Sequence, residues 1–252
     1  MKLLTAIPVY NEERHLEAVL REVRRYSPHI LVVNDGSTDR TAALLDQYAN
    51  GDGSIAVVTH PQNRGYGAAL VSAFEYALRT DCDVLVTMDC DGQHEPARIP
   101  VLCEAIHDAD IVSGSRYLRD FRQQSLPTPT DRRVINETIT REINDLLGFN
   151  LTDAFCGFKA YRCDMLAKLH ITETGWGMPL QLWVQAAQLG LRVTEVGVPR
   201  LYLDPTRAFG GMLNDADERL RYYRRVIADA VAEQSLLNYW TMDCMPVTRS
   251  CR

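Results

Sequence analysis

No stretch of about 18 consecutive apolar residues occurs in this sequence, so it predicts no transmembrane helix. The apolar start is too short for a signal peptide, because Pro8 and the polar residues 11–13 interrupt it. The seven cysteines are odd in number and scattered, which indicates free thiols in a reducing compartment rather than a disulfide framework. These absences favour a cytoplasmic protein, for which a peripheral contact with the inner membrane surface stays open.

An excess of positive charge is also missing. The formal net charge of −6 argues against a general nucleic-acid binder. Arginine nevertheless clusters between Arg116 and Arg141 and again between Arg192 and Arg225, which favours small anionic ligands over a polyanion. The sequence contains no internal repeat. Its composition, with 46% hydrophobic and 24% charged residues, is typical of a globular protein with a sizeable core.

Apolar, β-branched runs alternate with amphipathic helical patterns along the chain. The predicted strands are 3–9, 30–33, 55–59, 83–86, 111–113, a short strand ending at 162, and 191–198. The predicted helices are 12–26, one beginning near 39, 68–79, 97–107, 132–147, 179–189 and 215–237. This βαβ spacing predicts an α/β fold with a mainly parallel sheet and helices on both faces. Residues 120–131 are predicted to form a flexible loop, and 200–211 a second loop.

Polar, turn-forming residues follow the predicted strands. They are Asn11, Asp35, Asn63, Asp89 and Ser115. Because the carboxyl ends of parallel strands meet at one edge of a sheet, we expect these residues to lie along one rim. A ligand bound across that rim is the default expectation for such a sheet.

Residues 87–94 carry the clearest chemical pattern. Gly92 and Pro96 end the preceding strand, so Asp89 and Asp91 fall at its carboxyl end. Two carboxylates one residue apart in a turn can both bend toward one hard cation. Magnesium and manganese prefer such oxygen ligands together with the phosphates of a substrate. A metal–diphosphate site is therefore the central hypothesis.

The spacing within this stretch also bears on other kinds of site. An acidic pair that is merely solvated remains an alternative. A calcium loop of the EF-hand type is disfavoured, because counting from Asp89 puts His94 where glycine belongs and Pro100 where glutamate belongs. A zinc site would need Cys90, His94, Cys103 and His107, among which no pair has the usual short cysteine spacing.

Five motifs, taken in order, resemble the family 2 glycosyltransferases. They are residues 8–12 (PVYNE), 34–39 (NDGSTD), 63–67 (NRGYG), 89–94 (DCDGQH) and 114–117 (GSRY). Within that family the sequence is most similar to the dolichol-phosphate or polyprenyl-phosphate mannosyl- and glucosyltransferases. The resemblance is specific over residues 3–117 and looser over 132–211.

The resemblance implies a single GT-A domain over residues 1–238, with a nucleotide-sugar-binding half (1–117), an acceptor-binding half (118–238) and a disordered tail (239–252). By the same likeness, six residues would contact the nucleotide-sugar: Pro8, Tyr10, Glu12, Asp35, Asp89 and Cys90. Mg²⁺ or Mn²⁺ would be held by Asp89 and Asp91, with Gln93 as a further ligand. Asp35 would bind the base, with helix capping as the alternative, and Tyr10 could instead pack on the sheet rim.

The implied activity is metal-dependent, inverting transfer of a hexose from a donor of the GDP-mannose or UDP-glucose type to a polyprenyl or dolichyl phosphate. Catalytic roles would fall to Asp91, Arg116 and Asp153. The acceptor phosphate would be held by four arginines: Arg116, Arg132, Arg133 and Arg207. Asp153 either orients the acceptor, acts as a base for a hydroxyl acceptor or forms a structural turn. Lys159 and Arg162 are expected on a solvated strand face.

The absence of a carboxylate from one predicted helix start indicates which kind of acceptor the site takes. A hydroxyl acceptor usually needs a general base, whereas a phosphate monoester is already ionised near neutral pH. Residues 177–182 (GMPLQL) hold no carboxylate where many hydroxyl-using relatives carry an acidic pair, which favours phosphate. Two departures from the resembling branch, Cys156 and residues 208–212 (AFGGM), keep a soluble hydroxyl acceptor open.

A nucleotide-sugar-binding protein without turnover is a third reading of the same motifs. If the acceptor is a lipid, it would be met at the bilayer surface, through the loop near Phe121 and Leu126.

Overall fold

The computed structural model describes residues 1–49, 53–118, 130–199, 201 and 211–243. The strands are β1 Leu3–Val9, β2 Ile30–Asn34, β3 Ile55–Thr59, β4 Val84–Thr87, β5 Ile111–Ser115, β6 Lys159–Arg162 and β7 Val193–Gly197. The α-helices are α1 Leu16–Val23, α2 Thr41–Ala49, α3 Tyr66–Arg79, α4 Ile99–Ala105, α5 Thr130–Leu147, α6 Cys163–Leu166, α7 Met178–Gln188 and α8 Ala216–Asp243. The 3₁₀ turns are η1 Pro96–Arg98, η2 Ile106–Asp108 and η4 Gly211–Asn214.

The strands form one sheet in the order β3-β2-β1-β4-β6-β5-β7. All of its pairings are parallel except those of β6 with β4 and with β5. The predicted α/β fold with a mainly parallel sheet is therefore confirmed. Because β6 runs against its neighbours, the residues before it reach the rim at which β4 and β5 end.

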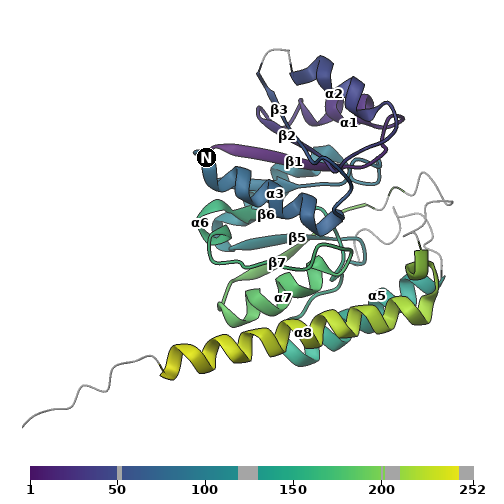
Figure 1. The fold of residues 1–252 in the computed structure, drawn as a ribbon. Helices are drawn as coiled ribbons and strands as arrows, with labels where there is room; N and C mark the ends of the chain where they lie inside the picture. Colours follow the sequence, from purple (N-terminus) through teal and green to yellow (C-terminus); the bar gives the residue numbers. More distant parts are fainter. Residues whose placement is uncertain (50–52, 119–129, 200, 202–210, 244–252) are drawn as a thin grey trace, which may run out of the picture.

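Side chains alternate between the two faces of the sheet, as the period of a strand requires. In β1, Leu4 and Ala6 join one buried cluster, whereas Ile7 and Val9 join the other. The first cluster packs under α3, α5, α7 and α8, and the second under α1 and α4. In Figure 1, the long α8 lies beside α5 along one side of the molecule. Helices thus cover both faces and leave the rims for binding.

Several element boundaries differ from the predicted ones. Helix α1 begins at Leu16 rather than at residue 12, because residues 13–15 form a turn. The predicted helix 97–107 is divided into η1, α4 and η2. Helix α8 continues to Asp243, into the predicted tail. Most of the predicted loops 120–131 and 200–211 lies outside the described residues.

Within the described ranges, no helix combines the length and the apolar character needed to cross a bilayer.

Candidate active site

The loops after β1 and β2 are tied together at the rim of the sheet. Asn11 adopts a left-handed backbone conformation with φ of 57°, which turns the chain sharply after β1. Its Oδ1 accepts the N–H groups of Thr38 at 2.8 Å and Asp39 at 3.3 Å, and its own N–H donates to Ser37 Oγ. The two motifs that carry Tyr10 and Asp35 therefore form one wall.

Asp35 is buried in this wall and organises the neighbouring loop. Its Oδ1 lies 2.6 Å from His60 Nδ1 and accepts the Arg64 N–H at 2.9 Å, while Oδ2 accepts the Gly65 N–H at 2.8 Å. A carboxylate offers about four acceptor positions, so these partners leave room for one further donor. Asp35 thus anchors residues 63–67 and does not cap a helix, and base binding has to use the remaining position.

The other residues expected to line the nucleoside pocket differ in exposure. Tyr10 is 43% exposed, and Pro8 is partly buried within β1. Glu12 is buried, and its Oε2 lies 2.9 Å from His15 Nδ1. Cys90 is only 2% exposed and packs in the core under α4, so contact with a nucleotide is open to its backbone and not to its thiol.

Asp89 and Asp91 lie in the turn that follows β4, as the sequence predicted. Asp89 Oδ1 accepts the Tyr66 hydroxyl at 3.0 Å, and the Asp89 N–H donates to His94 Nδ1 at 3.1 Å. His94 Nε2 lies 3.9 Å from Asp89 Oδ2. The Tyr66 hydroxyl therefore orients the Asp89 carboxylate, and the Asp89 side chain stays 32% exposed.

Asp91 is placed by the same turn. Its Oδ1 accepts the Gln93 N–H at 3.0 Å, and Gly92 between them has a positive φ of 72°. Glycine adopts such a conformation without strain, so the turn can bring both carboxylates to the rim. Gln93 lies in the same turn and is partly buried.

The chemistry of this turn fits a divalent cation. Gly157 faces Asp89 so closely that an added Cβ would lie 2.8 Å from both carboxylate oxygens, so glycine is needed for this orientation. No group of three or more His, Cys, Asp or Glu side chains suited to a metal occurs in the part of the chain that the structure describes. Two carboxylates alone suit Mg²⁺ or Mn²⁺, which take further oxygens from water and substrate phosphates. The same finding leaves the zinc alternative at Cys90 and His94 without support.

Arg116 follows β5 at the rim and is held by Asp153. Arg116 Nε donates to Asp153 Oδ2 at 2.6 Å, and a terminal nitrogen donates to Oδ1 at 2.9 Å. The Asp153 side chain is fully buried, whereas that of Arg116 is 21% exposed. Bidentate pairing fixes the plane of a guanidinium as well as its position. Arg116 is therefore a preorganised cation that stays partly exposed.

Asp153 is itself held by hydrogen bonds to two other residues. Asn136 Nδ2 donates to its Oδ1 at 2.9 Å, and the Asp153 N–H donates to Glu195 Oε1 at 3.1 Å. Burial by itself would raise the pKa of Asp153, but the charge of Arg116 and the hydrogen bonds of Arg116 and Asn136 lower it to about 2. A carboxylate with such a pKa is a poor proton acceptor near neutral pH. The geometry thus favours positioning of Arg116 over the general-base role.

Comparison with known proteins bears on this site. The chain matches the sequence profile of glycosyl transferase family 2 over residues 5–169. The chain belongs to glycosyl transferase family 2. It is 35% identical over 86% of its length to an undecaprenyl-phosphate mannosyltransferase from Micrococcus luteus, of which it covers 91%. It is 35% identical over 78% of its length to a polyprenol monophosphomannose synthase from Mycolicibacterium smegmatis, of which it covers 76%.

Solved structures agree on the fold. A glucosyl-3-phosphoglycerate synthase from Mycobacterium tuberculosis, in complex with phosphoglyceric acid, superposes with a TM-score of 0.68 at 18% identity, over 92% of this chain and 80% of that one. A mannosyltransferase from Pyrobaculum calidifontis, in complex with GDP-mannose and Mn²⁺, gives a TM-score of 0.56 at 16% identity, over 93% and 75%. The GT-A fold that the resemblance implied is confirmed, and the chain is a glycosyltransferase.

Lys159 of this glycosyltransferase is not on a solvated face, and that expectation was wrong. It is 2% exposed, its Nζ donates to the Cys156 carbonyl oxygen, and its ammonium lies 5.2 Å from the centroid of the Trp183 ring. The reason is that β6 lies inside the sheet, where Tyr161 packs in one buried cluster and Ala160 in the other, so both faces of the strand are covered. Burial lowers the pKa of Lys159. Arg162, at the end of β6, is 41% exposed as expected.

The remaining arginines predicted to hold the acceptor phosphate are less organised than Arg116. Arg133 is exposed and donates from Nε to Glu137 Oε1 at 2.8 Å, one turn further along α5. Arg132 is partly buried, and its positive charge opposes the rise in the pKa of the Tyr223 hydroxyl that burial causes. Arg207 lies outside the described residues. Phosphate binding by these three arginines stays a prediction.

Two aromatic residues of the glycosyltransferase's site were missed by the sequence analysis. Tyr66 stacks on Trp176, with ring centroids 5.0 Å apart and an interplanar angle of 15°, and its hydroxyl reaches Asp89. Tyr66 lies within the motif 63–67, where only the glycines were considered. Trp176 comes from the distant segment before α7, which packs closely on Gly65 and Gly67. Nothing local in the sequence indicates that contact.

Glu173, in the same segment, was also missed. Its Oε1 accepts the Tyr222 hydroxyl at 2.6 Å and the Gly175 N–H at 2.7 Å. These bonds fix the segment that carries Trp176. The Glu173 carboxylate is therefore engaged in holding the loop in place.

Proposed function

We propose that this glycosyltransferase moves a hexose, with mannose as the leading candidate, from a nucleotide-diphospho-sugar to the phosphate of a polyprenyl phosphate, with inversion at the anomeric carbon. The observation that carries the proposal is the rigid Arg116–Asp153 pair on the rim that also carries Asp89 and Asp91. The names of the two relatives at 35% identity support both the mannose and the lipid phosphate.

The proposed reaction needs no proton to be removed from the acceptor. An oxygen of the acceptor phosphate attacks the anomeric carbon, the bond from that carbon to the diphosphate breaks, and the nucleoside diphosphate leaves. The carboxylates of Asp153, Glu173 and Glu195 are already committed to hydrogen bonds within the chain. A phosphate acceptor is ionised near neutral pH, so it suits a site that offers a fixed cation instead of a base.

The donor side is assigned to the turn after β4. Asp89 and Asp91 would hold the divalent ion, and Gln93 is a further candidate ligand. When bound, Mg²⁺ or Mn²⁺ supplies Lewis-acid stabilisation of the diphosphate leaving group. Pro8, Tyr10, Glu12 and Asp35 would form the nucleoside wall, which the Asn11 bonds hold together. A lipid acceptor also implies that the protein works at a membrane surface.

Organic extraction tests the acceptor. The full chain is incubated with labelled GDP-mannose, Mn²⁺ and undecaprenyl phosphate in detergent, and UDP-glucose replaces GDP-mannose in a parallel series. We expect label from one of these donors to enter the organic phase only when undecaprenyl phosphate is present. Label that remains in the aqueous phase as a new glycoside, made with a soluble acceptor, would refute the lipid proposal and favour the hydroxyl alternative.

Replacing Tyr66 with phenylalanine tests how Asp89 is oriented. The substitution removes the hydroxyl that donates to Asp89 Oδ1 and keeps the ring that stacks on Trp176. Loss of a hydrogen bond that orients a metal ligand typically costs about 10–100-fold in metal affinity, and we expect a decrease of about tenfold for Mn²⁺ in the presence of GDP. The measurement is a Mn²⁺ titration followed by electron paramagnetic resonance.

The matched control for that titration is Tyr76→Phe. Tyr76 lies on the same helix, α3, and lines a cavity at the opposite rim of the sheet. We expect Tyr76→Phe to keep the Mn²⁺ affinity of the unmodified protein. Equal affinities for Tyr66→Phe and Tyr76→Phe would show that the Tyr66 hydroxyl does not support the metal site.

A further inference from the structure

The rim opposite the candidate active site brings together two cysteines that the proposed reaction does not use. Strand β6 runs antiparallel to β4, so its last residues lie beside the first residues of β4. Val84 pairs with Arg162, and the Cys163 N–H donates to the Asp83 carbonyl oxygen at 2.9 Å. This register places Cys163 opposite Asp83, and therefore one residue from Cys82, just beyond the end of the ladder.

The two thiols lie close together. Cys163 belongs to the buried cluster under α3 and α7, Cys82 packs against that cluster, and each thiol shifts the pKa of the other. Cys82 Sγ donates to the Ala77 carbonyl oxygen at 3.5 Å. Neighbouring positions across a strand pair can meet the Cα separation of about 4.4–6.8 Å that a disulfide needs.

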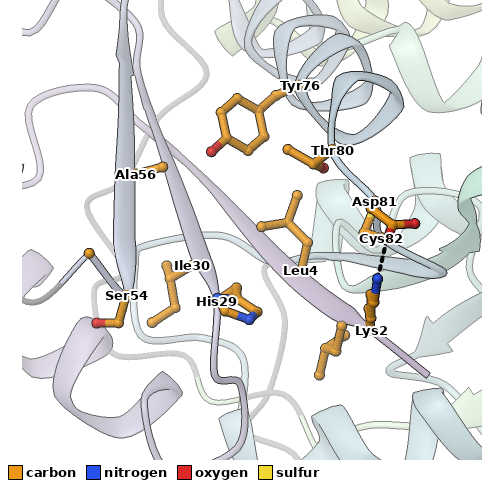
Figure 2. A pocket seen from close by; sticks show the side chains of 12 residues that line it. Lys2, Leu4, His29, Ile30, Ser54, Ala56, Tyr76, Thr80, Asp81 and Cys82 are labelled. Atoms are coloured by element: carbon orange, nitrogen blue, oxygen red, sulfur yellow. Dashed lines mark hydrogen bonds and ion pairs between the residues drawn. The ribbon is translucent and has the colours of Figure 1, made fainter.

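Cys82 is also accessible from outside the fold. It is partly buried and lines a cavity of about 260 Å³, at a point where Figure 2 shows it close to Lys2 and Asp81. It lines a second cavity of about 400 Å³ together with Asp83 and Arg162. A small thiol or disulfide can therefore approach its sulfur, whereas Cys163 lies behind it with 7% exposure.

The two cysteines differ in the properties that distinguish an attacking thiol from a resolving thiol in disulfide exchange. The hydrogen bond from Cys163 lowers the pKa of Cys82 to about 7, and the same contact raises the pKa of Cys163. The thiolate is the attacking form, so Cys82 is the nucleophile and Cys163 the thiol that resolves the intermediate. Cys103 differs, because burial raises the pKa of its thiol to about 11.

We propose that Cys82 and Cys163 form a reversible dithiol–disulfide site that small disulfides of the glutathione type oxidise. The Cys82 thiolate attacks one sulfur of oxidised glutathione, the S–S bond breaks and one glutathione thiolate leaves. Cys163 then loses its proton to solvent, attacks the Cys82 sulfur of the mixed disulfide and releases the second glutathione. Two protein thiols are oxidised, and one glutathione disulfide is reduced to two thiols.

The disulfide would join the start of β4 to the end of β6. The opposite ends of the same two strands carry Asp89 and Gly157, so the bond would clamp the ladder on which the candidate active site is built. The site does not depend on the proposed sugar transfer, because it needs only the fold and the thiols.

A glutathione redox titration tests the proposal. The full chain is equilibrated at pH 7.5 in buffers of varied reduced-to-oxidised glutathione ratio, quenched with acid, alkylated and mapped by mass spectrometry. We expect a Cys82–Cys163 disulfide to form in one two-electron transition while Cys90, Cys103 and Cys156 stay alkylated as free thiols. Absence of this disulfide at every ratio, or its replacement by one that involves Cys244 or Cys251, would overturn the proposal.

Three variants make the test specific. Cys163→Ser should stop at a mixed disulfide between Cys82 and glutathione, and Cys82→Ser should give neither product at Cys163. Cys103→Ser, the matched control, should leave the transition unchanged. A mixed disulfide that forms equally well on Cys163 in Cys82→Ser would contradict the assigned roles.

Discussion

Replacing Asp91 with alanine is expected to abolish Mn²⁺-dependent binding of GDP and to lower kcat/KM by about 10²–10³-fold, the usual cost of losing one preorganised electrostatic group. Asp91 lies in the turn after β4 with one carboxylate oxygen bonded to the Gln93 N–H. Without this carboxylate, a cation would keep Asp89 as its only acidic ligand from the pair. Its diphosphate partner would then lose the charge that links it to the protein.

Calorimetry with GDP, with and without Mn²⁺, measures the effect. Unmodified protein should bind GDP more tightly when Mn²⁺ is present, and Asp91→Ala should show the same weak affinity in both buffers. Asp81→Ala serves as the matched control, because Asp81 is exposed at the opposite rim of the sheet. If Asp91→Ala keeps the Mn²⁺-dependent gain in affinity, Asp91 is not a metal ligand.

Arg116→Lys is expected to lower kcat/KM for the polyprenyl phosphate acceptor by about 100-fold, mainly through a higher KM for that acceptor. Lysine keeps the charge, but it cannot reproduce the two parallel bonds to Asp153 and offer further fixed donors at the same time. The acceptor phosphate would then bind to a lysine ammonium group whose position is not fixed. Binding of GDP with Mn²⁺ should stay unchanged, because it depends on the other side of the site.

The thermal midpoint of the variant has to be measured alongside the kinetics. Breaking a buried ion pair costs about 3–5 kcal/mol when one partner is removed, and lysine should retain part of that stability. Arg162→Lys provides the matched control, since Arg162 is exposed at the far end of β6. An Arg116→Lys protein that folds and keeps the KM for polyprenyl phosphate would contradict the assignment of Arg116 to the acceptor.

The donor side of the site was the part that the sequence predicted best. Asp89 and Asp91 were placed at the end of a strand because an apolar, β-branched run stops at Gly92, and the structure has them there. Asp35 was correctly placed on the same wall, yet its bond to His60 was not foreseen. That bond joins residues from different strands, and no local pattern reports such a contact.

The acceptor side was predicted less well. The sequence allowed three roles for Asp153. Its burial against Arg116 favours the positioning role over that of a general base. Lys159 was expected in solvent because lysine is rarely buried without a partner. Its partners, the Cys156 carbonyl and the Trp183 ring, become visible only once β6 is known to lie inside the sheet.

The sequence by itself determined the alternation of strands and helices, the position of the binding rim and the acidic pair on it. These features follow from short-range patterns of apolar, turn-forming and charged residues, which act within a few positions along the chain. The tertiary structure alone decided that β6 enters the sheet antiparallel between β4 and β5. Strand pairing depends on partners elsewhere in the chain, so this one insertion places Gly157 at Asp89, Asp153 at Arg116 and Cys163 at Cys82.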